Sequence, residues 1–291
     1  NDNNPMDDHG HGTHCAGTVA GDGTAGSQTG VAPEATIIAL KVLDATGNGT
    51  EAGVWAAIQF IVDHDGDVIS MSLGWQHSWG VDRESWRNSF NNALAAGVIA
   101  SVAAGNEGGD LGTYPIPDNV RTPGDCPPPW LHPDQTLIGG VSAVVCVGAT
   151  SSNDNIAYFS SRGPVTWSAI NSFNDYAYNP GMGLIRPDVS APGDNIKSLD
   201  YASNTGYADG WSGTSMATPA VAGTMALMLN KNPNLTPVEM NMALELTAIE
   251  LGAAGKDNVY GSGRINALEA FNFVNFPGPV YNSHVIADPN S

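Results

Sequence analysis

Residues 210–223 read Gly-Trp-Ser-Gly-Thr-Ser-Met-Ala-Thr-Pro-Ala-Val-Ala-Gly and place Ser215 where a glycine-flanked turn runs into an apolar helix. A serine hydroxyl is a poor nucleophile unless a neighbouring base removes its proton. The first turn of a helix offers unpaired N–H groups and the positive end of its dipole, which suit an oxyanion beside that hydroxyl. The stretch therefore predicts a nucleophile or, in the ordinary case, a serine that caps a buried helix.

A histidine cluster near the start of the sequence supplies a candidate base. Residues 9–18 read His-Gly-His-Gly-Thr-His-Cys-Ala-Gly-Thr and open a helix of small residues. Together the two stretches resemble the serine and histidine motifs of the subtilisin-like serine proteases, the subtilases. The resemblance makes Ser215 the nucleophile and His11, the first histidine of His-Gly-Thr-His, the general base and acid. It leaves His14 as a structural neighbour and His9 as a solvated residue.

A third stretch resembles the oxyanion-hole segment of the same family. Residues 101–108 read Ser-Val-Ala-Ala-Gly-Asn-Glu-Gly and end an apolar run. The resemblance implies that the amide of Asn106 stabilises the developing oxyanion together with the backbone N–H of Ser215. Without the other two motifs, an asparagine in a glycine-flanked turn is an ordinary turn residue.

The resemblance also indicates where a peptide substrate binds. Ser72, Leu73 and Gly74 would pair with an extended substrate as with an added strand. The facing wall of the pocket, for the side chain before the cleaved bond, would come from Ala103, Ala104 and Gly105. Both walls are small and apolar, so we expect a large uncharged side chain to fit. The floor is expected from an insertion at 108–140, which leaves the cleavage specificity open.

Apolar runs alternate with helical patterns, which is typical of an α/β domain whose parallel sheet is covered on both faces. We expect a subtilisin-like three-layer α/β sandwich with a mostly parallel central sheet over residues 1–274, and a tail or linker over 275–291. Strands are predicted at 36–43, 67–73, 98–104 and 144–149, helices at 51–64, 83–96, 214–229, 236–246 and 264–274, and surface insertions at 108–140 and 167–183.

The charge balance excludes several classes of partner. The 291 residues include 29 acidic and 10 basic side chains, for a formal net charge of −19. This argues against binding to nucleic acid or to anionic lipid, because both need a cationic surface. It favours solubility through net negative charge, and acid-rich loops that hold calcium are a second interpretation. No run of 18 apolar residues is present, so we expect no membrane span.

The family resemblance implies a secreted serine endopeptidase that acts on proteins or peptides through a Ser-His-Asp triad and an acyl-enzyme. It implies no cofactor for catalysis. Structural calcium is expected because members of the family often bind it, although the loop 21–30 does not clearly match a family calcium loop. The metal ligands therefore stay unassigned.

The cysteines leave two questions open. Three cysteines are too few for a disulfide scaffold, but Cys126 and Cys146 could close one loop or remain two unpaired core thiols. Cys15 is expected to be a small buried hydrophobe. A zinc site competes with the protease interpretation, but it lacks the glutamate of a zincin motif and leaves the serine motif unexplained. Its ligands would be His9, His11, His14 and Cys15.

The third member of the triad has no clear counterpart. Subtilases run Asp, His, Ser along the chain, with the aspartate at the end of a strand, whereas only ten residues precede His11. Asp2, Asp7 and Asp8 lie there, but none follows an apolar strand. We therefore expect the aspartate and a central strand to come from a companion N-terminal segment, separated by a nick before Asn1. The alternative is a nicked or degenerate protease that serves as a binding or structural module.

Overall fold

A four-stranded parallel sheet, in the order β1-β2-β5-β6, forms the centre of the computed structural model, which describes residues 6–24, 26, 29–135, 140–203 and 205–274. Its strands are β1 (Val68–Met71), β2 (Ile99–Ala103), β5 (Val144–Thr150) and β6 (Val189–Pro192). Every residue of β2 and β5 is buried, as expected for parallel strands that are covered on both faces. The predicted strands at 67–73, 98–104 and 144–149 are thus confirmed.

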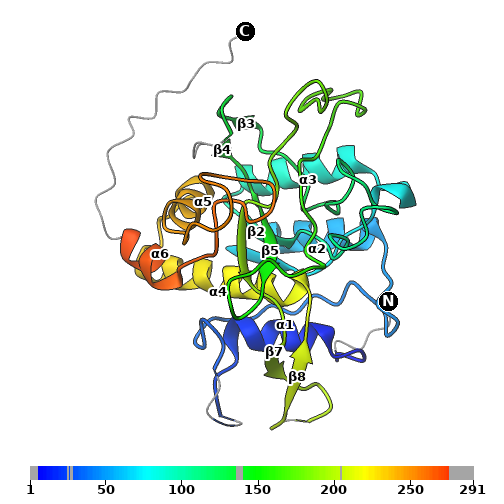
Figure 1. Cartoon of the computed structure of the whole chain (residues 1–291). Helices are drawn as coiled ribbons and strands as arrows, with labels where there is room; N and C mark the ends of the chain where they lie inside the picture. The colour runs from blue at the N-terminus through cyan, green and yellow to red at the C-terminus, as the bar shows by residue number, and fades with distance from the viewer. Residues whose placement is uncertain (1–5, 25, 27–28, 136–139, 204, 275–291) are drawn as a thin grey trace.

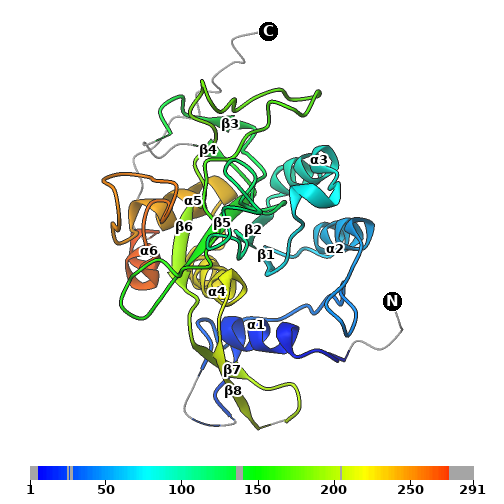
Figure 2. The same ribbon diagram turned by 45° about the vertical axis from the view of Figure 1, so that its right-hand side comes forward.

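Helices cover both faces of this sheet, which confirms the predicted α/β layers (Figures 1 and 2). On one face, α2 (Glu51–Asp63) and α3 (Arg83–Ala95) pack their apolar side chains against β1 and β2. On the other face, α4 (Thr214–Lys231), α5 (Pro237–Leu246) and α6 (Ala267–Phe273) pack against β5 and β6. The last helix begins three residues later than the predicted start at 264.

The N-terminal helix α1 (His11–Ala20) lies outside the sheet, against α4 and a small antiparallel ladder. That ladder joins β7 (Ile196–Leu199) to β8 (Tyr207–Trp211). A Cβ at Gly17 would lie 2.6 Å from side-chain atoms of both Ser198 and Leu199, so α1 packs directly on β7. The remaining elements are η1 (His77–Trp79), a 3-10 helix, and the pair β3 (Trp130–Leu131) and β4 (Gly140–Val141).

The strand predicted at 36–43 is the main error of the sequence analysis. No residue of this segment is in a strand, and Ile37 and Ile38 are 45% and 44% exposed. Leu40 and Val42 still pack partly against the hydrophobic cluster around β1. A strand needs a neighbour for its backbone N–H and C=O groups, and β1 pairs only with β2 among the described residues. The apolar run therefore lacks a pairing partner.

The two insertions pack together. Trp167, which is fully buried, donates from Nε1 to the carbonyl oxygen of Asp125 at 3.0 Å. Cys126, in the first insertion, and Cys146, in β5, are both buried and both free, so no disulfide joins them. The predicted tail at 275–291 lies outside the described residues, and within those residues no helix has the length and apolar character to cross a membrane.

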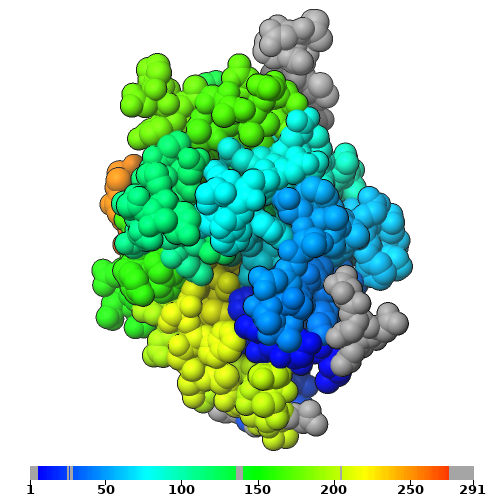
Figure 3. Space-filling view, turned by 90° about the vertical axis from the view of Figure 1, so that its right-hand side faces the viewer, coloured from blue at the N-terminus to red at the C-terminus, as the bar shows by residue number. Residues whose placement is uncertain are grey.

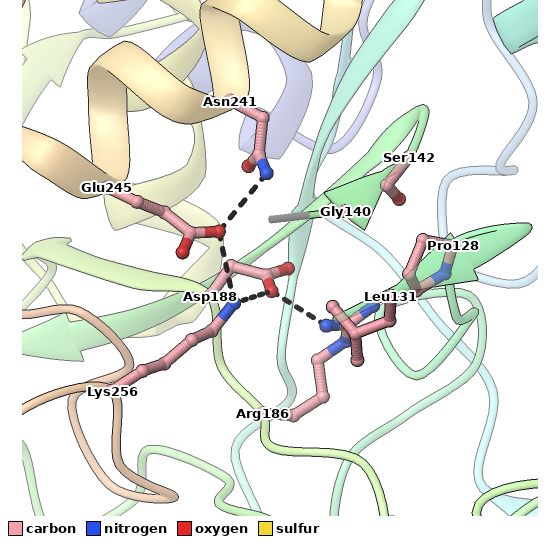
Figure 4. A pocket seen from close by; sticks show the side chains of 9 residues that line it. All are labelled: Pro128, Leu131, Gly140, Ser142, Arg186, Asp188, Asn241, Glu245 and Lys256. Carbon is pink, nitrogen blue, oxygen red and sulfur yellow. Dashed lines mark hydrogen bonds and ion pairs between the residues drawn. The ribbon is translucent and has the colours of Figure 1, made fainter. Parts of the chain in front are cut away.

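A buried ion network ties β6 to the C-terminal helices (Figure 4). The Oδ1 atom of Asp188 accepts from Nη1 of Arg186 and from Nζ of Lys256, each at 2.7 Å. Lys256 also donates to Oε1 of Glu245 at 3.0 Å, and Asn241 donates to the same oxygen at 3.1 Å. All four charged side chains are at least nine-tenths buried, so each depends on its partners for solvation.

Candidate active site

Ser215 lies in the first turn of α4 and faces the segment that follows β1. Its hydroxyl donates to the carbonyl oxygen of Ser72 at 3.3 Å, and the Ser72 hydroxyl donates to the carbonyl oxygen of Ser215 at 2.8 Å. This reciprocal pair sets the predicted nucleophile directly beside the predicted substrate strand, Ser72, Leu73 and Gly74. The side chain of Ser215 is half-buried, so its oxygen stays within reach of a ligand.

Asn106 approaches the same turn from the end of β2. Its Oδ1 atom accepts from the backbone N–H of Thr214 at 2.9 Å and from the Thr214 hydroxyl at 3.0 Å. Because the oxygen is engaged on the helix side, the Nδ2 donor points elsewhere, and it would lie 3.5 Å from a Cβ at Gly213. Asn106 is exposed, so this N–H₂ group is free to meet a ligand beside Ser215. Thr214 is the orienting residue, and sequence reasoning missed it although it directly precedes Ser215.

His11 is the first residue of α1, and the side chain of Cys15 contacts both His11 and Ser215. The Cys15 sulfur is 4.0 Å from Nδ1 of His11 and donates to the carbonyl oxygen of Ser215 at 3.4 Å. Burial is the largest cause that lowers the pKa of His11, and the charges of His9 and His14 lower it further. The ring is therefore neutral and can accept a proton near pH 7. Among the described residues, no hydrogen bond joins this ring to Ser215 or to a carboxylate. Figure 3 shows the dark-blue start of α1 beside the yellow surface that holds β8 and α4.

Asp7 caps the start of α1 instead of orienting His11. Its Oδ1 accepts from the backbone N–H groups of His9 at 2.9 Å and Gly10 at 2.8 Å, and its Oδ2 accepts from the N–H and hydroxyl of Thr13, both at 2.7 Å. Partial burial raises the pKa of Asp7, but these bonds outweigh it and lower the pKa to about 2. The carboxylate is therefore a helix cap, ionised at neutral pH.

Asp8 does not orient His11 either. Asp8 pairs with Lys41 at 2.8 Å, and Asp2 lies outside the described residues. Gly10, which follows Asp8 and His9, has a φ of 99° and no room for a side chain, because a Cβ there would lie 2.6 Å from the ring of Tyr201. The turn into α1 therefore requires a glycine.

The zinc interpretation is not supported by the described residues, which contain no group of three or more His, Cys, Asp and Glu side chains suited to a metal. His14 is fully buried and stacks on Trp211 with 4.9 Å between ring centroids, and the ring of His11 lies 6.1 Å from the same indole. In the loop 21–30, which does not clearly match a family calcium loop, the Oδ1 of Asp22 accepts from the N–H and hydroxyl of Thr24. The described part of that loop thus shows no set of acidic side chains for calcium.

The facing wall of the predicted pocket is buried and fixed to the first insertion. Ala103, Ala104 and Gly105 are all buried, and the carbonyl oxygen of Ala104 accepts from the N–H of Arg121 at 2.9 Å. The next residue, Thr122, exchanges two backbone hydrogen bonds with Trp75, at 2.7 and 3.0 Å. The segment 121–122 therefore joins the two walls.

Comparison with known proteins shows which family this chain resembles, independently of the geometry of the site. The model of a family described as the Subtilase family matches residues 1–263. "Serine protease AprX" of Bacillus subtilis (strain 168) is 34% identical to this chain over 298 residues, which cover 90% of the chain and 58% of that protein. "Subtilisin E" of the same strain is 33% identical, over 92% of the chain and 57% of its own length.

A third relative is matched over more of its own length. "Subtilisin Savinase" of Lederbergia lenta is 33% identical, over 91% of the chain and 78% of its own length. The chain thus spans less than three fifths of the first two relatives, which are the longer ones.

Proposed function

The chain belongs to the subtilase family, and from this premise we propose that it forms the catalytic part of a serine endopeptidase, which hydrolyses peptide bonds through an acyl-enzyme. One observation carries the proposal. The reciprocal hydrogen bonds between Ser72 and Ser215, next to the Thr214–Asn106 pair, gather a nucleophile, a substrate strand and an oxyanion donor around one helix start.

The reaction follows from the roles of these groups. The Ser215 hydroxyl leaves the Ser72 carbonyl, gives its proton to His11 and attacks the peptide carbonyl carbon. The Asn106 Nδ2 group and the Ser215 N–H then stabilise the oxyanion. His11 returns the proton to the leaving amine, which departs as the acyl-enzyme forms. Water, deprotonated by His11, attacks the ester and restores the free serine.

The substrate is proposed to bind as an extended chain. Its backbone would pair with the segment Ser72–Gly74, which follows β1 and whose free side faces the Ser215 turn. Main-chain hydrogen bonds of this kind bind many sequences, so the side chain before the cleaved bond carries the selectivity. That side chain would enter between this segment and the wall Ala103–Gly105.

A carboxylate that orients His11 is proposed to come from a companion N-terminal segment. Two observations support this proposal: no described carboxylate bonds to His11, and among the described residues β1 pairs with a strand on one side only. A further strand beside β1 would pair the backbone groups of that edge. Secretion and structural calcium also stay predictions from the family.

The competing function is a nicked or degenerate protease that acts as a binding or structural module. A fluorophosphonate probe separates the two, because it reacts with an activated serine and not with a helix cap. We expect the complete, folded protein to be labelled and Ser215→Ala to abolish labelling. Ser212→Ala is the matched control, since Ser212 is an exposed neighbour that bonds Asp194 and should leave labelling intact.

Two results would decide against the proposal. If the folded protein resists the probe, the binding module is favoured. If Ser212→Ala and Ser215→Ala lose labelling equally, the nucleophile is not assigned. Mass spectrometry of the native sample under denaturing conditions tests the companion segment: a second polypeptide of several kilodaltons is expected, and a single species would contradict it.

A further inference from the structure

Arg121 lies between the two walls of the predicted substrate pocket. A Cβ at Gly74 would lie 3.0 Å from Cβ of Arg121, and one at Gly105 would lie 2.9 Å from its Cγ. The N–H of Arg121 also donates to the carbonyl oxygen of Ala104 at 2.9 Å. The aliphatic part of the arginine therefore fills the space between the glycine ends of the walls. Arg121, a cationic side chain from the insertion at 108–140, thus takes the place expected for the floor of the predicted pocket.

The guanidinium of Arg121 keeps hydrogen-bond donors that its neighbours do not use. Its Nε donates to Oε1 of Glu107 at 3.0 Å, its Nη2 donates to the same oxygen, and its Nη1 makes a long bond of 3.4 Å to the Gly74 carbonyl. The other oxygen of Glu107 accepts from the Asn106 N–H at 2.8 Å and the Ser161 hydroxyl at 3.1 Å. The carboxylate is thus saturated, whereas a guanidinium has five N–H donors and retains some.

In the ion pair of Glu107 and Arg121, the glutamate side chain is more deeply buried than the arginine side chain. The side chain of Glu107 is 7% exposed and that of Arg121 is 28% exposed. A group that enters the pocket therefore meets the arginine and not the glutamate. The ion pair cancels most of the net charge, so the floor offers directed donors and little long-range field.

Surrounding residues hold Arg121 in place. Its guanidinium carbon lies 5.5 Å from the ring centroid of Trp79, which is itself 58% exposed at the rim. Two residues earlier along η1, His77 bonds to Asp118 at 2.8 Å and to Asp125 at 3.1 Å. These aspartates bracket Arg121 in the chain, so the segment that carries the arginine is tied to η1 on both sides.

We propose that Arg121 determines the specificity of this pocket and selects a side chain that ends in an acceptor oxygen, glutamate or glutamine, before the cleaved bond. The proposal rests on the endopeptidase function proposed above. An aromatic ring needs the depth that the arginine stem occupies. A lysine or arginine would face a like charge with no free acceptor, because Glu107 is saturated. The apolar walls alone led to the expectation of a large uncharged side chain; glutamine meets it, whereas glutamate carries a charge and phenylalanine lacks the acceptor oxygen.

Peptide p-nitroanilides that differ only in the residue before the cleaved bond test the proposal. With the complete protein, we expect kcat/KM for Glu and Gln to exceed that for Phe and Lys by about tenfold or more. Arg121→Ala opens the pocket and removes the donors, so the ratio of Phe to Glu should rise by at least about tenfold. Arg121→Met keeps most of the stem without donors and should lose the preference for Glu and Gln without a matching gain for Phe.

Lys197→Ala is the matched control, because it removes one cation from β7, outside the pocket, and should leave the order of substrates unchanged. Phe as the best substrate of the unaltered protein, or an unchanged order in Arg121→Ala, would overturn the inference. Both results require hydrolysis and fluorophosphonate labelling, so they leave the proposed function standing. A protein that is neither labelled nor active would instead remove the function itself.

Discussion

The sulfur of Cys15 lies 4.0 Å from Nδ1 of His11, the ring atom that a triad carboxylate would contact, and bonds the carbonyl oxygen of Ser215. The thiol thus packs between α1 and α4 beneath both candidate catalytic residues. Burial raises the pKa of Cys15 to about 11, so the group is a protonated thiol at neutral pH and a poor nucleophile. Cys15 is accordingly a packing residue of the site.

Replacing Cys15 should therefore change the activity little. We expect Cys15→Ala to retain peptidase activity within about threefold, because it removes a weak donor and a small volume. Iodoacetamide at pH 8 should modify the native thiol far more slowly than the thiol in urea, as intact mass would show. Rapid alkylation of the native protein, or a loss of activity as complete as that of Ser215→Ala, would contradict this assignment.

Thr214 is expected to act through Asn106. Thr214→Val removes the hydroxyl bond to Oδ1 of Asn106 and leaves the backbone bond, so kcat should fall by about tenfold while KM stays nearly constant. Thr214→Ser should restore kcat. Asn106→Ala should cost about a hundredfold, the size known for the oxyanion-hole asparagine of subtilisin itself.

The double variant is the decisive measurement for that pair. In an Asn106→Ala background, Thr214→Val should have little further effect on kcat, because the amide it orients is gone. Independent, multiplicative losses would show that Thr214 acts through stability or packing alone.

His77 should make the stability depend on pH. Burial lowers the pKa of His77, but its bonds to Asp118 and Asp125 and the charge of Asp125 outweigh burial and raise it. A raised pKa stabilises the fold fully below the unfolded value of about 6.5, and this contribution disappears as the pH rises through the folded value. His77→Gln should therefore lower the free energy of unfolding by about 1–2 kcal/mol at pH 6 and by less at pH 9.

Urea unfolding at the two pH values measures this difference. His132→Gln is the control, because His132 is only half-buried and its ring bonds the backbone of Asp134 in the same loop. A loss of stability in His77→Gln that is equal at pH 6 and pH 9 would show that the charge of His77 contributes nothing.

Lys256 is expected to be essential for the buried ion network. Lys256→Met would leave Asp188 with one cation and Glu245 with none, so the free energy of unfolding should fall by about 3–5 kcal/mol. Lys197→Met, on an exposed lysine that is 3.7 Å from Asp209, should change it by no more than about 0.5 kcal/mol. Urea denaturation at neutral pH compares the two. Equal stability of both variants would mean that water solvates the network.

The sequence predicts those parts of the fold that are encoded locally. The runs at 98–104 and 144–149 are continuous and apolar, which is how fully buried strands appear, and both are strands. The run at 36–43 has the same character, but pairing is a property of two segments, and this run has no strand partner among the described residues. Short polar strands such as β7, which carries Lys197, give no periodic signal and were missed.

The same distinction applies to the site. Ser215 and Asn106 lie in short motifs, so the sequence alone identifies them as candidates. Arg121 reaches the pocket only because its insertion folds back between Gly74 and Gly105, and no local pattern encodes that approach. Thr214 is intermediate: it is adjacent to Ser215 in sequence, but its hydrogen bond to Asn106 is long-range.

The unpaired edge of β1 has a kinetic consequence. Among the described residues, the side of β1 away from β2 has no strand partner, and such an edge can pair with any extended polypeptide, including a second copy of this chain. If the proposed companion strand pairs with this edge, its assembly competes with self-association, and the second process grows faster with concentration. The yield of folded protein from refolding should accordingly be highest in dilute solution with the companion present from the start.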